Sequence, residues 1–372
     1  MTHGIHVTGL GWSTPLGDGI EDVWQQLLAG HDGFAPLGAP FPLRNELAAA
    51  VPSVPPGPDH GARLTALAAK GLRAAFADAG LDPAEDGVAL VLGTSYGAHL
   101  DEEAESLYDW AGRCAEAVAF PGAPVCVSTA CSAASDALLV GAELVRSGRY
   151  RAVVCGGADI LTPAKRLAHS MLGTMTGERL RAFDTGHSGM LLGEGAGFLV
   201  LEPDAARAGR SYAVLRGVGA SNDAVGLTAP AADGRTVRTA VERALADSGL
   251  GAADIAAVSA HGTGTVLNDE AEARGLAMVF GEQPDAPVVF GTKGALGHSL
   301  GACGAVEAIT LVLALRDRTA PPVAGLRTPI GEAAGLVRPG RRTVHGTAGV
   351  SLTLGFGGFN TALVFTVDGG TS

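Results

Sequence analysis

Cys131 lies at a junction where one predicted element gives way to another. Residues 124–127 have the composition of a buried strand, small residues follow, and the apolar spacing of residues 137–145 is typical of a helix. At a helix start, unpaired backbone N–H groups and the helix dipole stabilise a thiolate, so the position suits a nucleophile. Free cysteines are also often buried simply as packing groups. The local sequence therefore leaves two interpretations of Cys131 open.

Two histidines and a lysine occupy similar turns further along the chain. His261 follows the predicted strand 255–259, while Lys293 and His298 lie in a glycine-rich turn between a predicted strand and a helix. Sites in α/β proteins form at the carboxyl ends of strands. The chain has only three lysines, and Lys293 is the one that lies among glycines, which favours a chemical role.

Glu307 is expected on a helix of small residues, where an unpaired buried charge is unfavourable. Lys293 is its natural partner. Taken singly, His261 and His298 are more often structural than catalytic, and glycine–threonine turns such as the one after His261 are common. Only the combination of these residues carries a functional prediction.

Several kinds of site are disfavoured. The glycine-rich turns match neither GxxxxGK[ST] nor GxGxxG with a suitably spaced acidic residue, so they predict no phosphate-binding loop. His261 and His298 lack short metal-ligand spacings, so we expect no metal. The formal net charge of −12 opposes non-specific nucleic acid binding. No apolar run reaches the roughly 18 residues that span a membrane. We therefore expect neither nucleic acid nor a membrane as partner.

The elements that position these residues are expected to repeat. Residues 77–81 and 246–250 share one pattern at a helix end, and with no gap Gly93-Thr94 then aligns with Gly262-Thr263. This offset predicts an internal duplication. Strands alternating with helices predict mostly parallel sheets with helices on both faces. We place the halves at residues 1–205, which carry Cys131, and 206–372, which carry both histidines.

The composition predicts a large buried core, because 47% of the 372 residues are hydrophobic and 17% are charged. The five cysteines are odd in number, which favours reduced thiols over disulfides. The N-terminus shows no charged segment followed by an apolar core. We therefore expect a cytoplasmic protein.

Five motifs together resemble one known family, the β-ketoacyl-acyl carrier protein synthases. They are STACSA around Cys131, AHGTGT at His261, KGALGHSLGACGAVE from Lys293 to Glu307, GEGAGFLVLE over residues 193–202 and GFGGFN over residues 355–360. These condensing enzymes of fatty acid and polyketide synthesis have the thiolase fold, and the resemblance runs from about residue 4 to 366. It implies an α/β thiolase fold whose duplicated halves form a five-layer αβαβα sandwich.

The resemblance also implies residue roles, those of an elongating ketosynthase with a Cys-His-His triad. Cys131 would carry the acyl group, while His261 and His298 would stabilise the enolate that forms when malonyl thioester loses carbon dioxide. The supporting roles fall to Lys293 and Glu307 as a polar network, Phe356 as oxyanion donor and gate, and Thr263, Thr265 and Asn360 as contacts to pantetheine. No metal or other cofactor is implied, since phosphopantetheine arrives on the acyl carrier protein.

Some segments depart from the family pattern. The segment 97–124 is shorter and more acidic than in typical family members. Residues 184–189 stand where those members have a charged Arg-Asp-Gly motif. These departures favour specialised metabolism over bulk fatty acid synthesis. An acyltransferase or cyclase without elongation is an alternative, and a non-catalytic partner subunit is disfavoured because Cys131 is present. The resemblance implies acyl carrier protein as partner and a homodimer, or a heterodimer with a related subunit. Possible contributors to a basic carrier-docking patch are Arg63, Arg73, Arg207 and Arg210.

Overall fold

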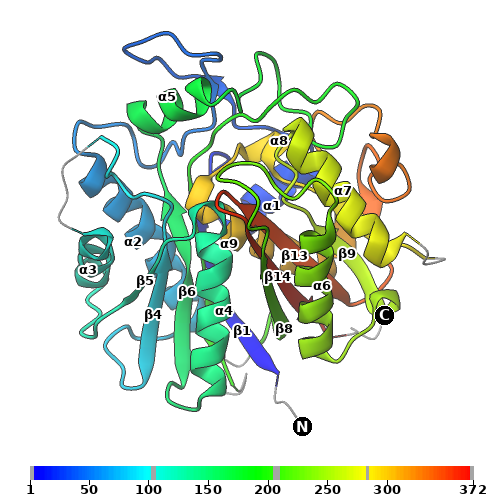
Figure 1. Ribbon diagram of the computed structural model, residues 1–372. Helices are drawn as coiled ribbons and strands as arrows, with labels where there is room; N and C mark the ends of the chain where they lie inside the picture. Colours follow the sequence, from blue (N-terminus) through cyan, green and yellow to red (C-terminus); the bar gives the residue numbers. More distant parts are fainter. Residues whose placement is uncertain (1–3, 102–105, 204–209, 282–284, 369–372) are drawn as a thin grey trace.

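The fold is described here in a computed structural model (Figure 1), which covers residues 4–101, 106–203, 210–281 and 285–368. Its centre is a ten-stranded sheet with the order β10-β9-β13-β14-β8-β1-β7-β6-β4-β5. The first five strands in the chain order of this sheet are β1 (Ile5–Ser13), β4 (Val88–Gly93), β5 (Val125–Val127), β6 (Ala152–Asp159) and β7 (Gly195–Glu202). The other five are β8 (Ala213–Asn222), β9 (Ile255–Ser259), β10 (Val288–Phe290), β13 (Ala348–Gly355) and β14 (Phe359–Thr366).

The sheet consists of two halves with the same strand order. Reading inward from either edge, β5-β4-β6-β7-β1 corresponds to β10-β9-β13-β14-β8, and the halves meet where β1 pairs antiparallel with β8. This repeat confirms the duplicated architecture that the aligned glycine–threonine pairs predicted. The boundary placed between residues 205 and 206 stays a prediction, because residues 204–209 lie outside the described part of the chain.

The expectation of mostly parallel sheets is wrong. In the first half β4 is parallel to β5 and β6, but β7 is antiparallel to both β6 and β1. In the second half β9 is parallel to β10 and β13, but β14 is antiparallel to β13 and β8. A parallel pair needs a crossover connection, whereas a short turn joins β13 directly to β14. Each half is therefore mixed.

The helices cover both outer faces of the sheet and fill the space between its halves. They are α1 (Ile20–Leu28), α2 (His60–Ala79), α3 (Leu107–Ala117), α4 (Ala133–Arg146), α5 (Pro163–Met171), α6 (Arg235–Ser248), α7 (Val266–Phe280), α8 (Lys293–Leu296) and α9 (Cys303–Arg316). Figure 1 shows α2 and α3 on one side of the molecule and α6 and α7 on the other. Helices α4 and α9 pack on each other and on strands of both halves, which makes the five layers of an αβαβα sandwich.

The sequences of the helices explain their layers. All of α9 from Cys303 to Leu315 is buried, as expected of a helix that is apolar all round. In α6, by contrast, Val237, Val241 and Ala244 are buried at helical spacing while the opposite face is exposed, as suits an outer layer. The lesser elements are the two-stranded pairs β2 (Ala35–Pro36) with β3 (Leu47–Ala48) and β11 (Thr319–Ala320) with β12 (Arg342–Thr343), and the 3-10 turns η1 (Ala130–Ser132), η2 (Ala252–Asp254), η3 (Leu300–Ala302) and η4 (Gly331–Ala333).

The central helices start from equivalent tight turns. The turn η1 leads into α4 and η3 leads into α9, and each opens on a non-glycine residue with positive φ, 50° at both Ala130 and Leu300. A Cβ at Gly301 would lie 2.4 Å from the backbone nitrogen of Ser95, so this glycine allows close approach of η3 to the first half. The two turns thus bring the start of α4 and the start of α9 together.

Within the described residues, none of the helices combines the length and apolar character needed to cross a bilayer. All five cysteines have free thiols, as the sequence predicted.

Candidate active site

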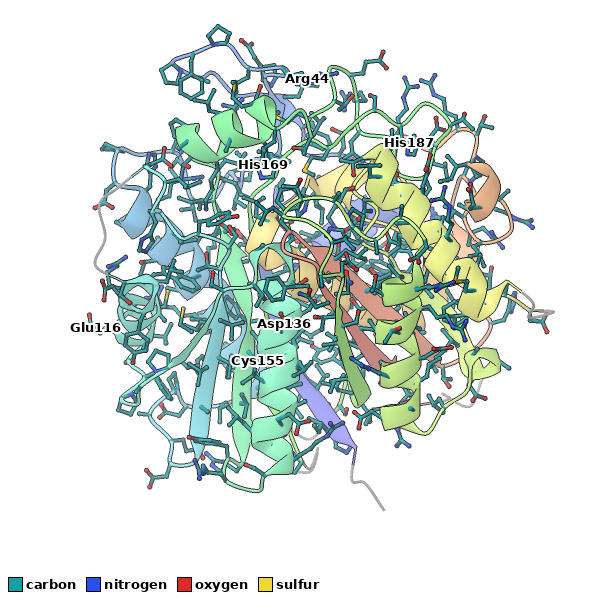
Figure 2. The ribbon with its side chains drawn as sticks, in the orientation of Figure 1. Arg44, Glu116, Asp136, Cys155, His169 and His187 are labelled. Atoms are coloured by element: carbon teal, nitrogen blue, oxygen red, sulfur yellow. The ribbon has the colours of Figure 1, made fainter. Side chains whose placement is uncertain are left out.

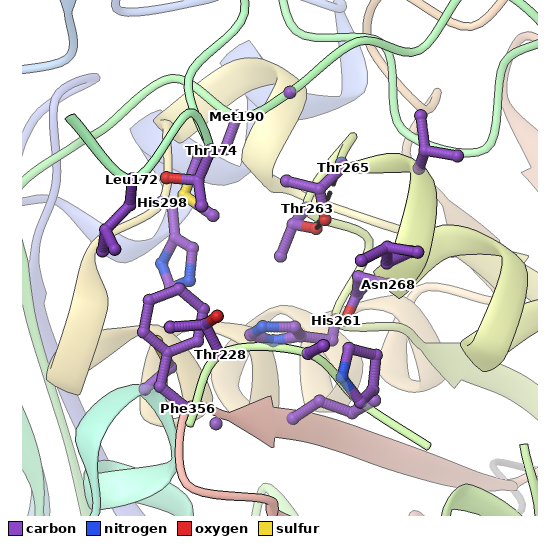
Figure 3. Close-up of a pocket in the computed structure, with 18 of the residues that line it drawn as sticks. Leu172, Thr174, Met190, Thr228, His261, Thr263, Thr265, Asn268, His298 and Phe356 are labelled. Atoms are coloured by element: carbon purple, nitrogen blue, oxygen red, sulfur yellow. Dashed lines mark hydrogen bonds between the residues drawn. The ribbon is translucent and has the colours of Figure 1, made fainter. Parts of the chain in front are cut away.

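A cavity of about 310 Å³ opens where the two halves meet (Figure 3). Six of the residues singled out from the sequence line it, namely Cys131, His261, Thr263, Thr265, His298 and Phe356. Cys131 lies in η1 at the start of α4, as predicted, and is 5% exposed. The duplication therefore places the cysteine of one half opposite the histidines of the other.

The His298 side chain is held in a single neutral form. Its Nδ1 accepts a hydrogen bond of 3.0 Å from the backbone N–H of Leu300. An imidazole nitrogen that accepts carries no proton, so the ring proton lies on Nε2. Burial, followed by the positive charge of Lys293, lowers the pKa of His298 well below its ordinary value. The ring is therefore a neutral hydrogen-bond donor through Nε2.

The His261 side chain reaches the same state through a different neighbour. It follows β9, and its Nδ1 lies 3.1 Å from Nζ of Lys293. Because an ammonium group only donates, Nδ1 must accept and the proton again lies on Nε2. Burial, followed by Lys293, lowers the pKa of His261 well below its ordinary value. The two imidazole rings meet edge to face with centroids 5.3 Å apart.

Lys293 and Glu307 form the buried ion pair that the sequence predicted. The Lys293 ammonium group contacts the Glu307 carboxylate and also donates to the backbone oxygen of His261 over 2.5 Å. Burial is the largest single influence and acts to lower the pKa of Lys293, but the Glu307 carboxylate together with Cys303 and Glu272 raises the net pKa. Lys293 is therefore charged and links Glu307 to His261.

The same ammonium group argues against a cation at this place. Donor atoms of His261, Cys303 and Glu307 lie within 4.8 Å of one another, a spacing that would suit a metal ion. The Lys293 ammonium group contacts both His261 and Glu307, so a metal ion here would face a fixed positive charge. The donor set does not fit a metal.

The expectation of a Cys131 thiolate is wrong for the resting protein. Burial raises the pKa of the Cys131 thiol to about 11, although the charge of Lys293 and a hydrogen bond from the backbone N–H of Phe356 both act to lower it. The thiol is therefore protonated at neutral pH. The hydrogen bond nevertheless places the Phe356 N–H against Sγ, where the sequence expected an oxyanion donor.

Thr263 and Thr265 line the cavity, and Asn360 does not. The hydroxyl groups of Thr263 and Thr265 lie 2.8 Å apart on the cavity wall. Asn360 is 1% exposed and does not line the cavity, because its side-chain amide donates to the Asp223 carboxylate over 2.8 Å. A direct contact of Asn360 with a ligand in the cavity is therefore not supported, since its side chain is held by Asp223, the residue after β8.

Sequence reasoning missed the acidic groups that hold the loop. Glu272 on α7 accepts the backbone N–H groups of His261 at 2.6 Å and Gly262 at 2.8 Å. Asp269, one turn earlier, accepts the N–H of Gly264 at 3.1 Å. Both carboxylates are fully buried. The sequence after AHGTGT contains no pattern that distinguishes Glu272 and Asp269 from residues on the solvent-exposed face of a helix.

A second buried ion pair was also missed. Lys165 on α5 contacts Asp159 at the end of β6, and both side chains are at most 1% exposed. Asp159 also accepts the backbone N–H groups of Ser95 and Gly301, each at 3.0 Å. The pair therefore ties α5 to η3. The rarity of lysine in the chain was the one signal that pointed to Lys165.

Of the four arginines proposed from the sequence for a basic patch, Arg63 is ruled out by its burial. Arg63 is 7% exposed and paired with Glu194, and Arg210 is paired with Asp78. Arg73 is exposed and donates to the backbone oxygen of Ala117. Arg207 lies outside the described residues.

Comparison with known proteins agrees with this geometry. Two family models match, "Beta-ketoacyl synthase, N-terminal domain" over residues 60–206 and "Beta-ketoacyl synthase, C-terminal domain" over residues 212–327. The chain is 30% identical over 408 residues to 3-oxoacyl-[acyl-carrier-protein] synthase 2 of Synechocystis sp., covering 97% of each chain.

Two solved structures have the same fold over nearly the whole chain. The ishigamide ketosynthase/chain length factor gives a TM-score of 0.90 at 27% identity and covers 99% of this chain and 100% of that chain. A β-ketoacyl synthase from Burkholderia phymatum gives a TM-score of 0.87 at 27% identity, with 98% and 100% covered. The chain therefore belongs to the β-ketoacyl synthase family of condensing enzymes.

Proposed function

We propose that the protein catalyses the decarboxylative condensation of an acyl thioester, carried on Cys131, with malonyl-acyl carrier protein. The observation that carries this proposal is the pair of neutral imidazoles with their protons on Nε2, set beside a cysteine in one buried cavity. Two such donors suit a reaction in which negative charge develops on an oxygen atom, and a water-excluding site strengthens them.

In the first half-reaction, Sγ of Cys131 attacks the carbonyl carbon of an acyl thioester. Because the pKa of the resting thiol is about 11, its proton leaves as the C–S bond forms and ends on the departing carrier thiol. The backbone N–H groups of Cys131 and Phe356 stabilise the tetrahedral oxyanion. The Phe356 N–H contact with Sγ supports this role. The product is an acyl group bonded to Cys131.

In the second half-reaction, the malonyl thioester loses its carboxylate as carbon dioxide, and the electron pair moves to the thioester oxygen. Nε2–H of His261 and Nε2–H of His298 donate to that oxygen and stabilise the enolate. The enolate carbon then attacks the acyl carbonyl, the C–S bond to Cys131 breaks, and the chain leaves two carbons longer on the carrier. Sγ takes up a proton and the thiol is restored.

The remaining parts of the proposal concern partners. Thr263 and Thr265 receive the phosphopantetheine arm of the carrier, and no metal or redox cofactor takes part. We place the protein in the cytoplasm. The name of the Synechocystis relative supports acyl carrier protein as the partner. The ketosynthase/chain length factor neighbour supports pairing with a second subunit, and β5 at the sheet edge supports an interface with an identical or a related chain.

The test is intact-protein mass spectrometry after mixing with an acyl-carrier protein and then with malonyl-carrier protein. We expect an acyl adduct that is absent in Cys131→Ala and present in Cys303→Ala. The latter is a matched control, since the Cys303 thiol donates to the Cys131 backbone oxygen over 3.3 Å. A product two carbons longer supports condensation. An adduct without carbon dioxide release favours an acyltransferase or cyclase instead, and no adduct favours a non-catalytic subunit.

A further inference from the structure

We propose that His187 is a positioning residue, whose imidazolium pairs with Asp269 and thereby holds the loop 263–265 that receives the phosphopantetheine arm. This inference rests on the proposed function, and it adds a pH-dependent control of carrier binding. Residues 184–189, which include His187, are one of the segments that depart from the family pattern, and the proposed mechanism gives His187 no role.

The first step concerns the place of His187 (Figure 2). Its side chain is 7% exposed, and Nδ1 lies 3.2 Å from Oδ2 of Asp269 in the first turn of α7. Its backbone N–H donates to the backbone oxygen of Asp184 over 2.9 Å. The Asp184 carboxylate in turn accepts the backbone N–H groups of Gly186 and Arg327. The turn that carries His187 is therefore anchored, which holds the imidazole against Asp269.

The second step concerns Asp269, which joins two segments and is fully buried. Its Oδ2 accepts the backbone N–H of Phe183 at 2.7 Å, and its Oδ1 accepts that of Gly264 at 3.1 Å. The backbone oxygen of Gly264 accepts the N–H of Gly189 at 2.8 Å. Both backbone groups of Gly264 are therefore tied to the segment 183–189, one directly and the other through Asp269.

The third step leads from Gly264 to the cavity. Gly264 lies between Thr263 and Thr265, which line the cavity and whose hydroxyl groups lie 2.8 Å apart. A shift of Gly264 therefore moves the two threonines that the proposed function assigns to phosphopantetheine. The backbone N–H of His261 is held separately by Glu272. Loss of the His187 contact should therefore affect carrier binding more than the chemical step.

The fourth step concerns the proton between His187 and Asp269. A carboxyl group is a much stronger acid than an imidazolium, so in such a pair the proton lies on the imidazole and Nδ1 donates. Among the residues that the structure describes, His187 is the one basic side chain within ion-pair distance of Asp269. The charge on His187 is therefore the counter-charge of this buried carboxylate.

The surrounding charges favour the imidazolium. The hydrogen bond to Asp269 raises the pKa of His187, burial opposes it, and the charges of Asp269 and Glu270 on α7 and of Asp184 on its own segment raise the pKa further above 6.5. The pairing is therefore complete below pH 6.5 and is lost as the pH rises through the raised pKa. Burial also raises the pKa of Glu272 to about 8, so the test must compare variants of His187 and not pH values alone.

The test is the KM for malonyl-carrier protein, measured by carbon dioxide release at about pH 6 and about pH 8.5, on either side of the histidine range. We expect the wild-type KM to rise about three- to tenfold from the lower to the higher pH, the difference between a hydrogen bond to a charged and to a neutral partner. His187→Arg keeps its charge, so its KM should change much less. His187→Gln keeps an N–H donor without charge and should have the higher KM at both pH values, with the kcat of the wild-type protein. His345→Gln changes an exposed histidine and is the matched control.

An equal rise of KM in the wild-type protein and in His187→Gln would overturn the inference, as would a wild-type KM that does not change with pH. A second measurement needs no substrate and also covers a variant that folds poorly. The thermal midpoint of the wild-type protein should exceed that of His187→Gln by more at about pH 6 than at about pH 8.5, and an equal difference would contradict the pairing. If the midpoints behave as expected but the wild-type protein releases no carbon dioxide, the proposed function has failed, and the role of His187 in carrier binding falls with it while its pairing with Asp269 stands.

Discussion

At the scale of single residues, two histidines reach the same protonation state through unrelated neighbours. A backbone N–H fixes Nδ1 of His298, and an ammonium group fixes Nδ1 of His261. Only the second of these contacts depends on a side chain. The pair is therefore open to a test in which one donor is removed and the other remains.

Lys293→Met removes that donor and the positive charge that lowers both imidazole pKa values. The neutral rings are the active form, so the wild-type protein should keep its decarboxylation activity as the pH falls below 6.5. In the variant the pKa of each histidine rises toward its ordinary value, so activity should be lost at a higher pH, and kcat at the optimum should fall at least tenfold.

The measurement is the pH profile of carbon dioxide release. Lys70→Met is the control, because the Lys70–Asp18 pair is on the surface, with side chains 40% and 32% exposed. An unchanged acid limb in Lys293→Met would contradict the proposed role of this lysine.

His169 gives a second pH-dependent prediction, this time for stability. The pKa of His169 in the folded protein is about 4, below its ordinary value of 6.5, so its contribution to stability is complete above pH 6.5 and is lost as the pH falls toward 4. Relative to His169→Phe, the wild-type protein should lose about 3 kcal/mol of unfolding free energy over that range. Urea unfolding of both proteins at several pH values checks this, and parallel pH curves would refute it.

At this scale the sequence was enough to single out Cys131, His261, Lys293 and Glu307 as site residues, because they stand within motifs whose residue types and spacing are characteristic. It did not predict the protonated thiol of Cys131. The pKa of that thiol depends on burial by segments far away in the chain, which no local pattern records.

At the scale of elements, the turns η1 and η3 place the site. The backbone of Gly301 lies against that of Ser95, and Asp159 accepts an N–H from both residues. His298 lies two residues before η3. The position of this histidine therefore depends on how closely η3 approaches the first half.

Gly301→Ala should disturb this approach. Its Cβ would lie 2.4 Å from the Ser95 nitrogen, so backbone must move, at a cost of about 1–3 kcal/mol. We expect a lower thermal midpoint and reduced decarboxylation. Gly112→Ala on α3 is the control, since its Cβ meets nothing within 4 Å and a helical alanine stabilises by about 0.5–1 kcal/mol. Equal thermal midpoints for Gly301→Ala and Gly112→Ala would contradict this prediction and show that η3 can move without loss of stability.

The elements themselves were largely predictable. The strand expected over residues 255–259 is β9, and the helix patterns at 77–81 and 246–250 are the ends of α2 and α6, each followed by a glycine with positive φ. The antiparallel direction of β7 and β14 was not predictable. Strand direction depends on the path of the connecting segments, and these segments show no periodic pattern in their sequence.

At the scale of the whole molecule, β5 ends the sheet with an exposed apolar surface. Val125, the first residue of β5, is 40% exposed, and Tyr108 on α3, which packs on β5, is 45% exposed. An unpaired edge with apolar side chains favours association. We expect the protein to dimerise through β5.

Val125→Lys should convert the expected dimer to a monomer, because it places a charge at the start of this edge strand. Sedimentation velocity measures the change. Met278→Lys on α7, where the native side chain is 47% exposed, is the control and should remain dimeric. If Val125→Lys sediments as the wild-type protein does, the interface lies elsewhere.

The duplication itself was visible in the sequence, but its consequence was not. The aligned glycine–threonine pairs predicted two similar halves, whereas the single continuous sheet joined through β1 and β8 requires knowledge of three-dimensional pairing. That junction completes the site, because it joins the half that carries Cys131 to the half that carries His261 and His298.

The most direct test of the account is a single turnover with acyl-loaded protein and malonyl-carrier protein labelled in the free carboxylate. We expect one carbon dioxide for each elongated product in the wild-type protein. In His298→Ala, Cys131 should still be acylated, but carbon dioxide release should be abolished. Acyl transfer to an acceptor with no carbon dioxide, or undiminished decarboxylation in His298→Ala, would contradict the proposed condensation.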